Sequence, residues 1–126
     1  QWETRSAMTP ELTQETIGQQ RQEADLSWWI RPAEPTATGT PLIVAISDAL
    51  PPPVFSITPQ IRFVPTIDLT VHIRAELSTI DWPAAEWVLV RFVTRHVSNG
   101  YLEEDGQIWL RDGTLLGMSR QLSVAK

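Results

Sequence analysis

Asp48 is the residue whose setting most strongly suggests chemistry, because it is the only charged residue in an apolar segment from Thr40 to Leu50. Burying a carboxylate is costly unless it is hydrogen-bonded or paired with a positive charge. A role in acid–base chemistry is one reason to keep such a group. An ion pair with a nearby arginine, or a position at the frayed end of a helix where the side chain reaches water, explains it equally well.

Thr66 and Gln121 are weaker candidates on pattern alone. Polar and apolar residues alternate from Thr66 to Arg74, so the polar face of this segment borders either water or a polar cleft. Gln121 shares its face of the last predicted strand with three small residues, Gly117, Ser119 and Ser123. Small residues there leave room for a ligand or for close packing against a helix. A solvated outer face and an ordinary exposed glutamine are the simpler explanations.

Other catalytic and ligand-binding patterns are incomplete. The segment from Gly117 to Gln121 lacks the final glycine of a Gly-x-Ser-x-Gly nucleophile elbow and lies in a predicted strand, so Ser119 is a poor nucleophile. His72 and His96 are too few and too isolated to indicate a metal site. The sequence contains no glycine-rich phosphate loop of the Walker or Rossmann type. We therefore expect neither a metal nor a cofactor.

Composition and charge exclude further classes of protein. The chain has 126 residues, 42% of them hydrophobic, which is enough for one domain with its own core. The absence of cysteine excludes disulfides, thiolate nucleophiles and thiolate metal sites. A net charge of −5 argues against a general binder of nucleic acids or anionic membranes. The sequence shows neither a membrane-spanning run nor a signal peptide, so we expect a cytoplasmic protein.

The elements that carry the candidates are one helix and about five strands. Thr40 is a candidate N-cap before Pro41, and apolar residues cover every face of the helix until Pro51-Pro52-Pro53 ends it. A helix that is apolar all round is wrapped by other structure. Strands are predicted at residues 24–30, 66–74, 87–97, 101–110 and 114–124, with a hairpin turn at Asp112-Gly113. The result is an α+β fold, an antiparallel sheet around one long buried helix.

The two N-terminal segments are less regular. Residues 2–7 resemble a strand, and the polar residues 8–23 are predicted as a short helix or a loop. The chain begins at Gln1 inside this strand-like run, which suggests a fragment or a processed chain.

Four motifs in this order resemble the TesB-like acyl-CoA thioesterase II family, and specifically the second, C-terminal hotdog domain of its double-hotdog proteins. They are Ile46-Ser47-Asp48-Ala49-Leu50-Pro51, Pro65-Thr66-Ile67-Asp68-Leu69-Thr70, Gly113-Thr114-Leu115-Leu116 and Ser119-Arg120-Gln121. The resemblance extends from about Trp28 to the C-terminus. It implies a hotdog fold, in which a curved antiparallel sheet wraps a long helix.

The resemblance also implies a hydrolytic site. Asp48 on the helix, Thr66 on the following strand and Gln121 on the last strand would together bind and orient a water for attack on a thioester. Such a site requires no metal and no covalent acyl-enzyme. The implied activity is hydrolysis of an acyl-CoA to a free acid and CoA.

Residues 1–126 are therefore expected to form a single hotdog domain, the C-terminal half of a double-hotdog protein. The second hotdog domain would come from the same or a separate chain, and we expect a homo-oligomer, because an unpaired sheet edge promotes aggregation. A non-catalytic module that binds acyl thioesters or polyketides is the alternative function. A dehydratase of the hotdog class is a third, but it calls for a histidine on or beside the helix, and residues 36–50 contain none.

Overall fold

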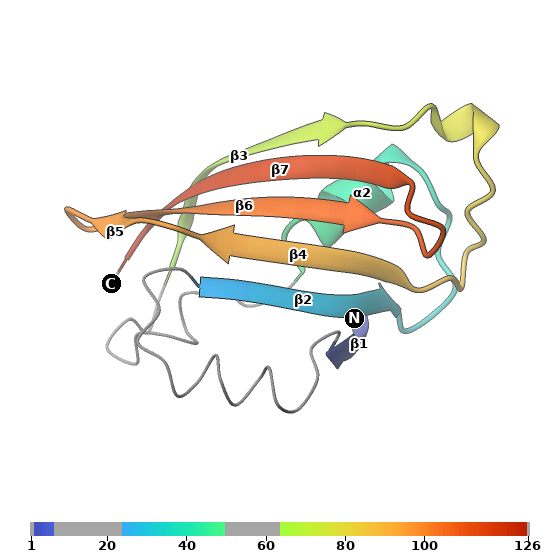
Figure 1. Ribbon diagram of the computed structural model, residues 1–126, viewed down its shortest axis with the longest axis horizontal. Coiled ribbons are helices and arrows are strands. Elements are labelled where there is room, and N and C mark those ends of the chain that lie inside the picture. Colours follow the sequence, from blue (N-terminus) through green and yellow to red (C-terminus); the bar gives the residue numbers. More distant parts are fainter. Residues whose placement is uncertain (1, 7–23, 50–63, 126) are drawn as a thin grey trace.

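The computed structural model describes residues 2–6, 24–49 and 64–125, which form one open antiparallel sheet and a short helix (Figure 1). The strands run in the order β1-β2-β4-β6-β7-β3, and β5 pairs with β6. Their bounds are β1 (Trp2–Ser6), β2 (Ala24–Pro32), β3 (Thr66–Ile73), β4 (Val88–Thr94), β5 (Val97–Ser98), β6 (Tyr101–Trp109) and β7 (Leu115–Val124). All five predicted main strands are confirmed, and the strand-like run at the N-terminus is β1. The predictions for residues 8–23 and for the proline stop lie outside the described residues.

Helix α2 (Thr40–Ile46) is shorter than predicted, and it begins differently. Gly39 is the N-cap residue, with a φ of 143° that favours glycine, so the prediction that Thr40 caps the helix is wrong. Pro41 lies in the first turn, as expected. Leu42, Ile43 and Ile46 are buried. A short 3₁₀ helix, η2, spans Leu77–Thr79. Neither is long and apolar enough to cross a membrane, nor is any other helix in the part of the chain that is described.

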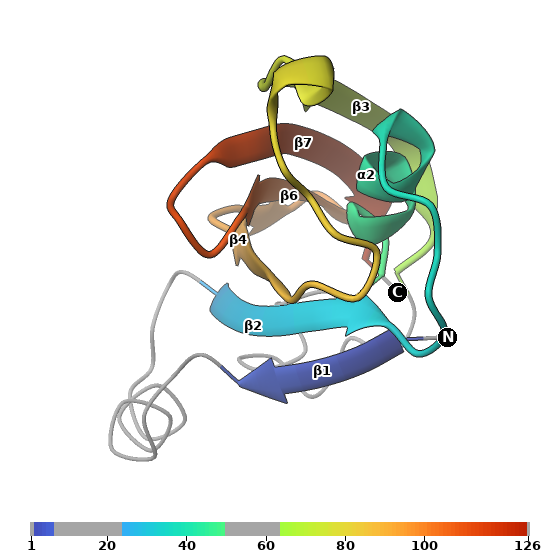
Figure 2. The ribbon, with the colours of Figure 1, turned by 90° about the vertical axis from the view of Figure 1, so that its right-hand side faces the viewer.

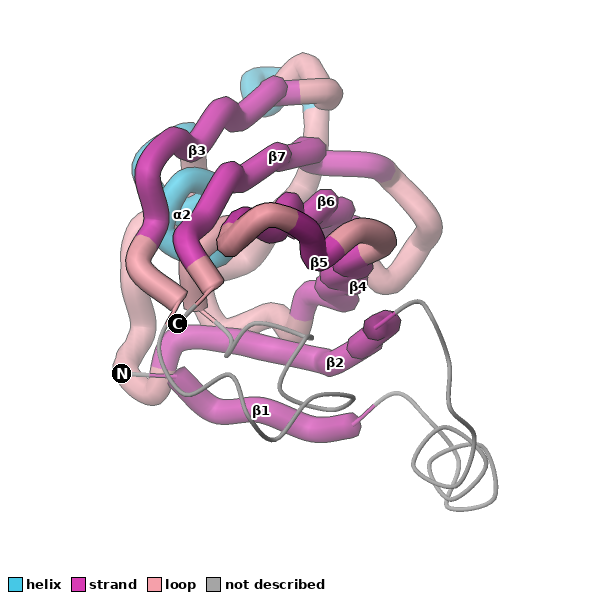
Figure 3. The backbone as a smooth tube through the Cα atoms, turned by 90° about the vertical axis from the view of Figure 1, so that its left-hand side faces the viewer, coloured by secondary structure: helices cyan, strands magenta, loops and turns pink. Residues whose placement is uncertain are grey.

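The sheet curves around α2, so the helix lies within the bend of the strands (Figures 2 and 3). Alternate residues of the central strands point toward the helix and form the core with it. The core members are Ile30, Leu42, Ile43, Ile46, Trp82, Val88, Val90, Phe92, Ile108, Leu110 and Leu116. One side of α2 is not covered by the described residues, since Val44 keeps 42% of its surface exposed. Within this chain α2 is therefore not buried on every face, and that part of the prediction is wrong.

Strand β3 departs from strict alternation at its first residues. Thr66 pairs with Ser123 and Asp68 with Leu122, so Ile67 is an extra residue in the ladder, a β-bulge. Beyond the bulge the alternation is as predicted. The bulge moves Thr66 off the outer face that Asp68 begins and aligns it with the helix-facing side of β7, where Ser123 is buried.

The hairpin between β6 and β7 has the predicted turn. The Thr114 backbone N–H donates to Asp112 Oδ1 at 2.9 Å, and Gly113 has a φ of 95°. This turn sets the register of β7 against β6 and so fixes which residues of β7 face the helix.

Gly117 on β7 allows the helix to approach the sheet closely. A Cβ atom at this position would lie 2.9 Å from Ile43 Cγ2 and 3.2 Å from the His72 carbonyl oxygen. Of the two explanations for small residues on this face, room for a ligand or close packing against a helix, the structure shows the second at Gly117.

We predict that Gly117→Ala lowers the free energy of unfolding by about 1–3 kcal/mol, because the added methyl overpacks the helix–sheet contact. Combining it with Ile43→Leu, which removes the Cγ2 methyl, should restore part of that loss. Urea unfolding of both variants and of Ile43→Leu alone tests this. Additive effects of the two substitutions would show that the clash with Ile43 does not exist.

Candidate active site

Gln121 lies between the other two predicted site residues and hydrogen-bonds to both. Thr66 Oγ1 donates to Gln121 Oε1 at 2.8 Å, and Gln121 Nε2 donates to Asp48 Oδ1 at 3.3 Å. Gln121 Nε2 also donates to the Ser47 carbonyl oxygen at 3.2 Å. Three segments that are far apart in sequence, the end of α2, the start of β3 and the last strand, therefore meet at one carboxamide.

The orientation of the Gln121 amide is determined by its partners. Gln121 is 4% exposed, and its oxygen faces a hydroxyl donor while its nitrogen faces a carbonyl and a carboxylate, which only accept. If the amide were flipped, its oxygen would face the Ser47 carbonyl and the Asp48 carboxylate, so acceptors would face acceptors. Both amide hydrogens are used in the observed orientation. Gln121 therefore has a fixed position, and the interpretation of it as an ordinary exposed glutamine is wrong.

Asp48 lies just beyond the end of α2 and is exposed, unlike the buried helical carboxylate that its apolar neighbours suggest. Ser47, the residue before it, is fully buried and donates its hydroxyl to the Ile43 carbonyl oxygen at 2.9 Å. The Asp48 N–H donates to the Ala45 carbonyl oxygen at 3.3 Å, which continues the turn of the helix. Asp48 Oδ1 accepts from Gln121, and no donor from the described residues reaches Oδ2.

Thr66 is also exposed, and the bulge directs its hydroxyl to Gln121. Because its hydrogen is donated to Gln121, the hydroxyl oxygen keeps lone pairs that can accept from another group. The arrangement thus presents two accessible acceptors, a carboxylate and a hydroxyl oxygen, on either side of a buried amide.

Two further buried polar residues, Glu104 next to Gln121 and Thr94 next to Glu104, lie on the helix side of the sheet. Neither was among the residues predicted from the sequence. Glu104 on β6 pairs with Gln121 on β7, and it is 4% exposed. Val93 pairs with Asp105, so the same register brings Thr94 beside Glu104 on the helix side of the sheet. Thr94 is 1% exposed, and its Oγ1 has no hydrogen-bond partner among the described residues. The alternation in residues 102–110 was a usable signal, because it places Glu104 on the apolar face.

Burial raises the pKa of Glu104 from its ordinary 4.5 to about 8, and the negative charge of Asp48 contributes to this rise. Both causes favour the protonated acid.

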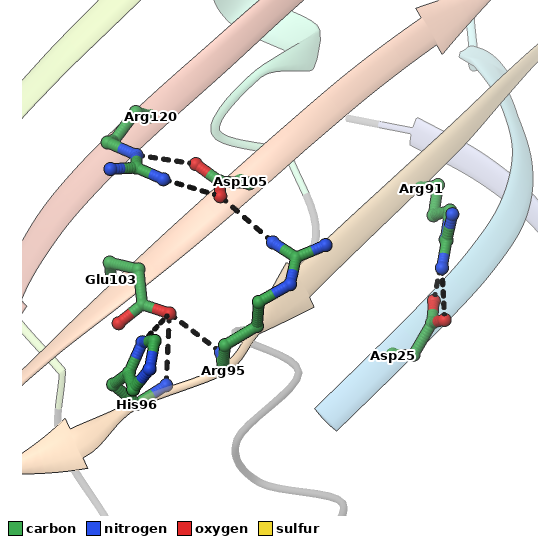
Figure 4. Close-up of polar contacts among 7 residues, drawn as sticks. All are labelled: Asp25, Arg91, Arg95, His96, Glu103, Asp105 and Arg120. Atoms are coloured by element: carbon green, nitrogen blue, oxygen red, sulfur yellow. Dashed lines mark hydrogen bonds and ion pairs between the residues drawn. The ribbon is translucent and has the colours of Figure 1, made fainter. Parts of the chain in front are cut away.

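A second feature lies on the opposite, outer face of the sheet. A groove of about 680 Å³ is lined there by side chains that include Asp68, His72, Arg91, Arg95, Asp105 and Arg120. Figure 4 shows that the arginines among them are paired with carboxylates, with α2 behind the sheet. Arg120 donates two hydrogen bonds to Asp105, at 2.7 and 2.8 Å, and holds the pKa of that carboxyl below its usual range. Carboxylates paired in this way are poor bases, so this face is a weaker candidate for hydrolysis.

The two histidines are also separate from the candidate active site. His72 lines the outer groove, and His96 Nδ1 lies 3.4 Å from Glu103 Oε1. Within residues 2–6, 24–49 and 64–125, no three metal-ligating side chains come together.

The comparison with protein families identifies the family of this chain. The model of the family described as "Acyl-CoA thioesterase C-terminal domain" matches residues 2–125. The chain belongs to this family. The resemblance to the TesB-like thioesterases is thereby confirmed. No match was found among curated proteins.

Similarity to solved structures confirms the predicted hotdog fold of this thioesterase-family domain. A conserved hotdog protein of unknown function from Alicyclobacillus acidocaldarius has a TM-score of 0.82 and 23% identity, covering 99% of this chain and 45% of that one. The TesB protein of Mycobacterium avium subsp. paratuberculosis has a TM-score of 0.73, 15% identity and coverages of 99% and 47%. The acyl-CoA thioesterase II TesB2 of Mycobacterium marinum has a TM-score of 0.63, 14% identity and coverages of 99% and 48%. The chain thus spans less than half the length of these proteins.

We predict that Thr66→Val lowers the free energy of unfolding by about 1 kcal/mol, because it leaves the buried Gln121 oxygen without its donor. Thr66→Ser keeps a hydroxyl and should stay close to the wild type. Thr70→Val on the outer face of β3 is the control for the change in side-chain type. Urea unfolding measures all three, and equal stability of Thr66→Val and Thr66→Ser would contradict the role of this hydrogen bond.

Proposed function

We propose that this domain hydrolyses acyl-CoA thioesters to a free acid and CoA, with Asp48, Thr66 and Gln121 as the catalytic site. The observation that carries the proposal is the bridging position of Gln121, which hydrogen-bonds to Asp48 and Thr66 at once. Membership in the acyl-CoA thioesterase C-terminal domain family supports the same reaction class.

The proposed chemistry uses the two accessible acceptors. A water placed between Asp48 and the Thr66 oxygen donates one hydrogen to each, which leaves a lone pair free to attack the thioester carbonyl carbon. Asp48 takes the proton as the new C–O bond forms, and the C–S bond then breaks to release CoA as a thiol or thiolate. Gln121 holds both acceptors in place, and its amide hydrogens are already used. In this proposal Gln121 orients the site rather than binding the water by its nitrogen.

Asp48→Asn should keep the fold and lower kcat by at least about 10²-fold, because an amide cannot take the proton from water. The matched control is Asp68→Asn, the same change at an exposed carboxylate on the outer face of β3. Release of free thiol from a panel of acyl-CoA substrates, from acetyl to palmitoyl, measures the rates.

Hydrolysis by Asp48→Asn at the wild-type rate would refute the mechanism. Acyl-CoA binding by calorimetry, with no hydrolysis by the wild type, would instead favour the non-catalytic binding module.

We further propose that a second hotdog domain, from another copy or from a longer protein that contains this chain, covers the exposed side of α2. Val44 is 42% exposed there, four residues before the exposed Asp48, and the edge strand β3 exposes Ile67. Apolar groups next to a catalytic carboxylate suit an interface that also excludes water from the site. Residues 1–126 would then be the C-terminal half of a double-hotdog unit.

The purified chain should therefore sediment as a dimer or a larger assembly at micromolar concentration, and Val44→Glu should shift it toward the monomer by placing a charge in the interface. Val97→Glu is the matched control, since Val97 on β5 is 43% exposed. A monomeric wild type would refute pairing with another copy of this chain, and equal effects of both variants would refute the position of the interface.

A further inference from the structure

Glu104 is a buried acid next to the candidate active site that the proposed mechanism does not use. It pairs with Gln121 across β6 and β7, and Gln121 hydrogen-bonds to Asp48. Among the described residues no hydrogen bond reaches the Glu104 carboxyl. Burial and the nearby negative charge of Asp48 both favour the neutral form of this carboxyl.

We propose that Glu104 controls the site through its charge alone: hydrolysis proceeds while its carboxyl is neutral and stops when that carboxyl is ionised. The inference rests on the proposed thioesterase function. It adds a residue and a dependence on protonation to the site formed by Asp48, Thr66 and Gln121.

The groups that face Glu104 make Asp48 its one charged neighbour within the described structure. From β7 it meets Gln121 and the flanking Ser119 and Ser123, and from β4 it meets Thr94 and Phe92. At the end of α2, Ser47 and Asp48 hydrogen-bond to Gln121, and the Asp48 charge acts on Glu104. Arg91 on β4, Arg95 just after it and Arg120 on β7 are on the outer face, where Arg95 and Arg120 bind Asp105. Among the described residues, no cation therefore compensates an ionised Glu104 on this side of the sheet.

Ionisation of Glu104 releases its proton to solvent and places a second negative charge near Asp48. The transition state of thioester hydrolysis develops negative charge on the carbonyl oxygen, so a second anion in the low-dielectric interior opposes it. A neutral Glu104 avoids this repulsion. Burial and the Asp48 charge together bring the pKa of Glu104 to about 8, and this pKa determines the pH at which activity falls.

The first test is the pH dependence of kcat/KM for the wild type, Glu104→Gln and the control Glu103→Gln. Glu103 is the adjacent residue on β6, and it accepts hydrogen bonds from the Arg95 and His96 backbone N–H groups on the outer face. Above about pH 8 the wild type and Glu103→Gln should lose about tenfold per pH unit, while Glu104→Gln stays level and keeps wild-type activity at pH 7 within about threefold. An alkaline fall in Glu104→Gln equal to that of the wild type would overturn the proposal, as would its inactivity at every pH.

The second test needs no turnover and no Glu104 variant. The carboxyl carbon of Glu104, followed by NMR in the wild type and in Asp48→Asn, reports its protonation directly. Removing the Asp48 charge should lower the pKa of Glu104 from about 8 toward its ordinary 4.5. An unchanged pKa would refute the coupling.

The pH dependence of the free energy of unfolding gives a third test, and the direction of its change follows from the pKa shift. Because folding raises the pKa of Glu104, its contribution to stability is fully present below 4.5 and is lost as the pH rises through about 8. The stability of the wild type relative to Glu104→Gln should therefore fall across this range in urea unfolding. Parallel pH dependences would refute a neutral buried Glu104. Absence of hydrolysis by the wild type at all pH values would refute the proposed function instead, so the two failures are distinguishable.

Discussion

The buried carboxamide of Gln121 is the interaction on which the rest of the site depends. A carboxamide presents a donor and an acceptor at fixed positions, so it can join a hydroxyl to a carboxylate without carrying a charge itself. Its burial makes the three hydrogen bonds mutually dependent, because the loss of one leaves a polar atom in the interior. The helix end can reach this group only because Gly117 has no side chain to keep α2 away from β7.

Much of the framework follows from the sequence alone. Alternation predicts the main strands, the Asp112-Gly113 pair predicts the hairpin turn, and the alternation in β7 places Gln121 on the same face as Gly117 and Ser123. These features depend on interactions between residues close in sequence or on a period of two. Local interactions and hydrophobic periodicity can both be recognised in a single amino-acid sequence.

The features that sequence could not supply depend on contacts between distant segments. The bulge at Ile67 arises from the register of β3 against β7, and without it the alternation directs Thr66 to the outer face with Asp68. The exposure of Asp48 follows from where α2 ends and from which side of it the sheet leaves open. Glu104 is different. The alternation in the sequence already places it on an apolar face, but only the structure shows that this position is next to Gln121 and close to Asp48.

The site therefore holds two carboxyl groups in contrasting surroundings, one exposed at the end of a helix and one buried in the sheet. Burial favours the neutral form of Glu104, and in the proposed mechanism Asp48 is the base. The open side of α2 connects this contrast to assembly. In the proposed assembly, a domain that covers both Val44 and Asp48 would exclude water from the site, and the interaction between the two carboxyls would become stronger as the local dielectric constant falls. In this proposal, covering of α2 therefore changes how strongly the protonation state of Glu104 affects Asp48.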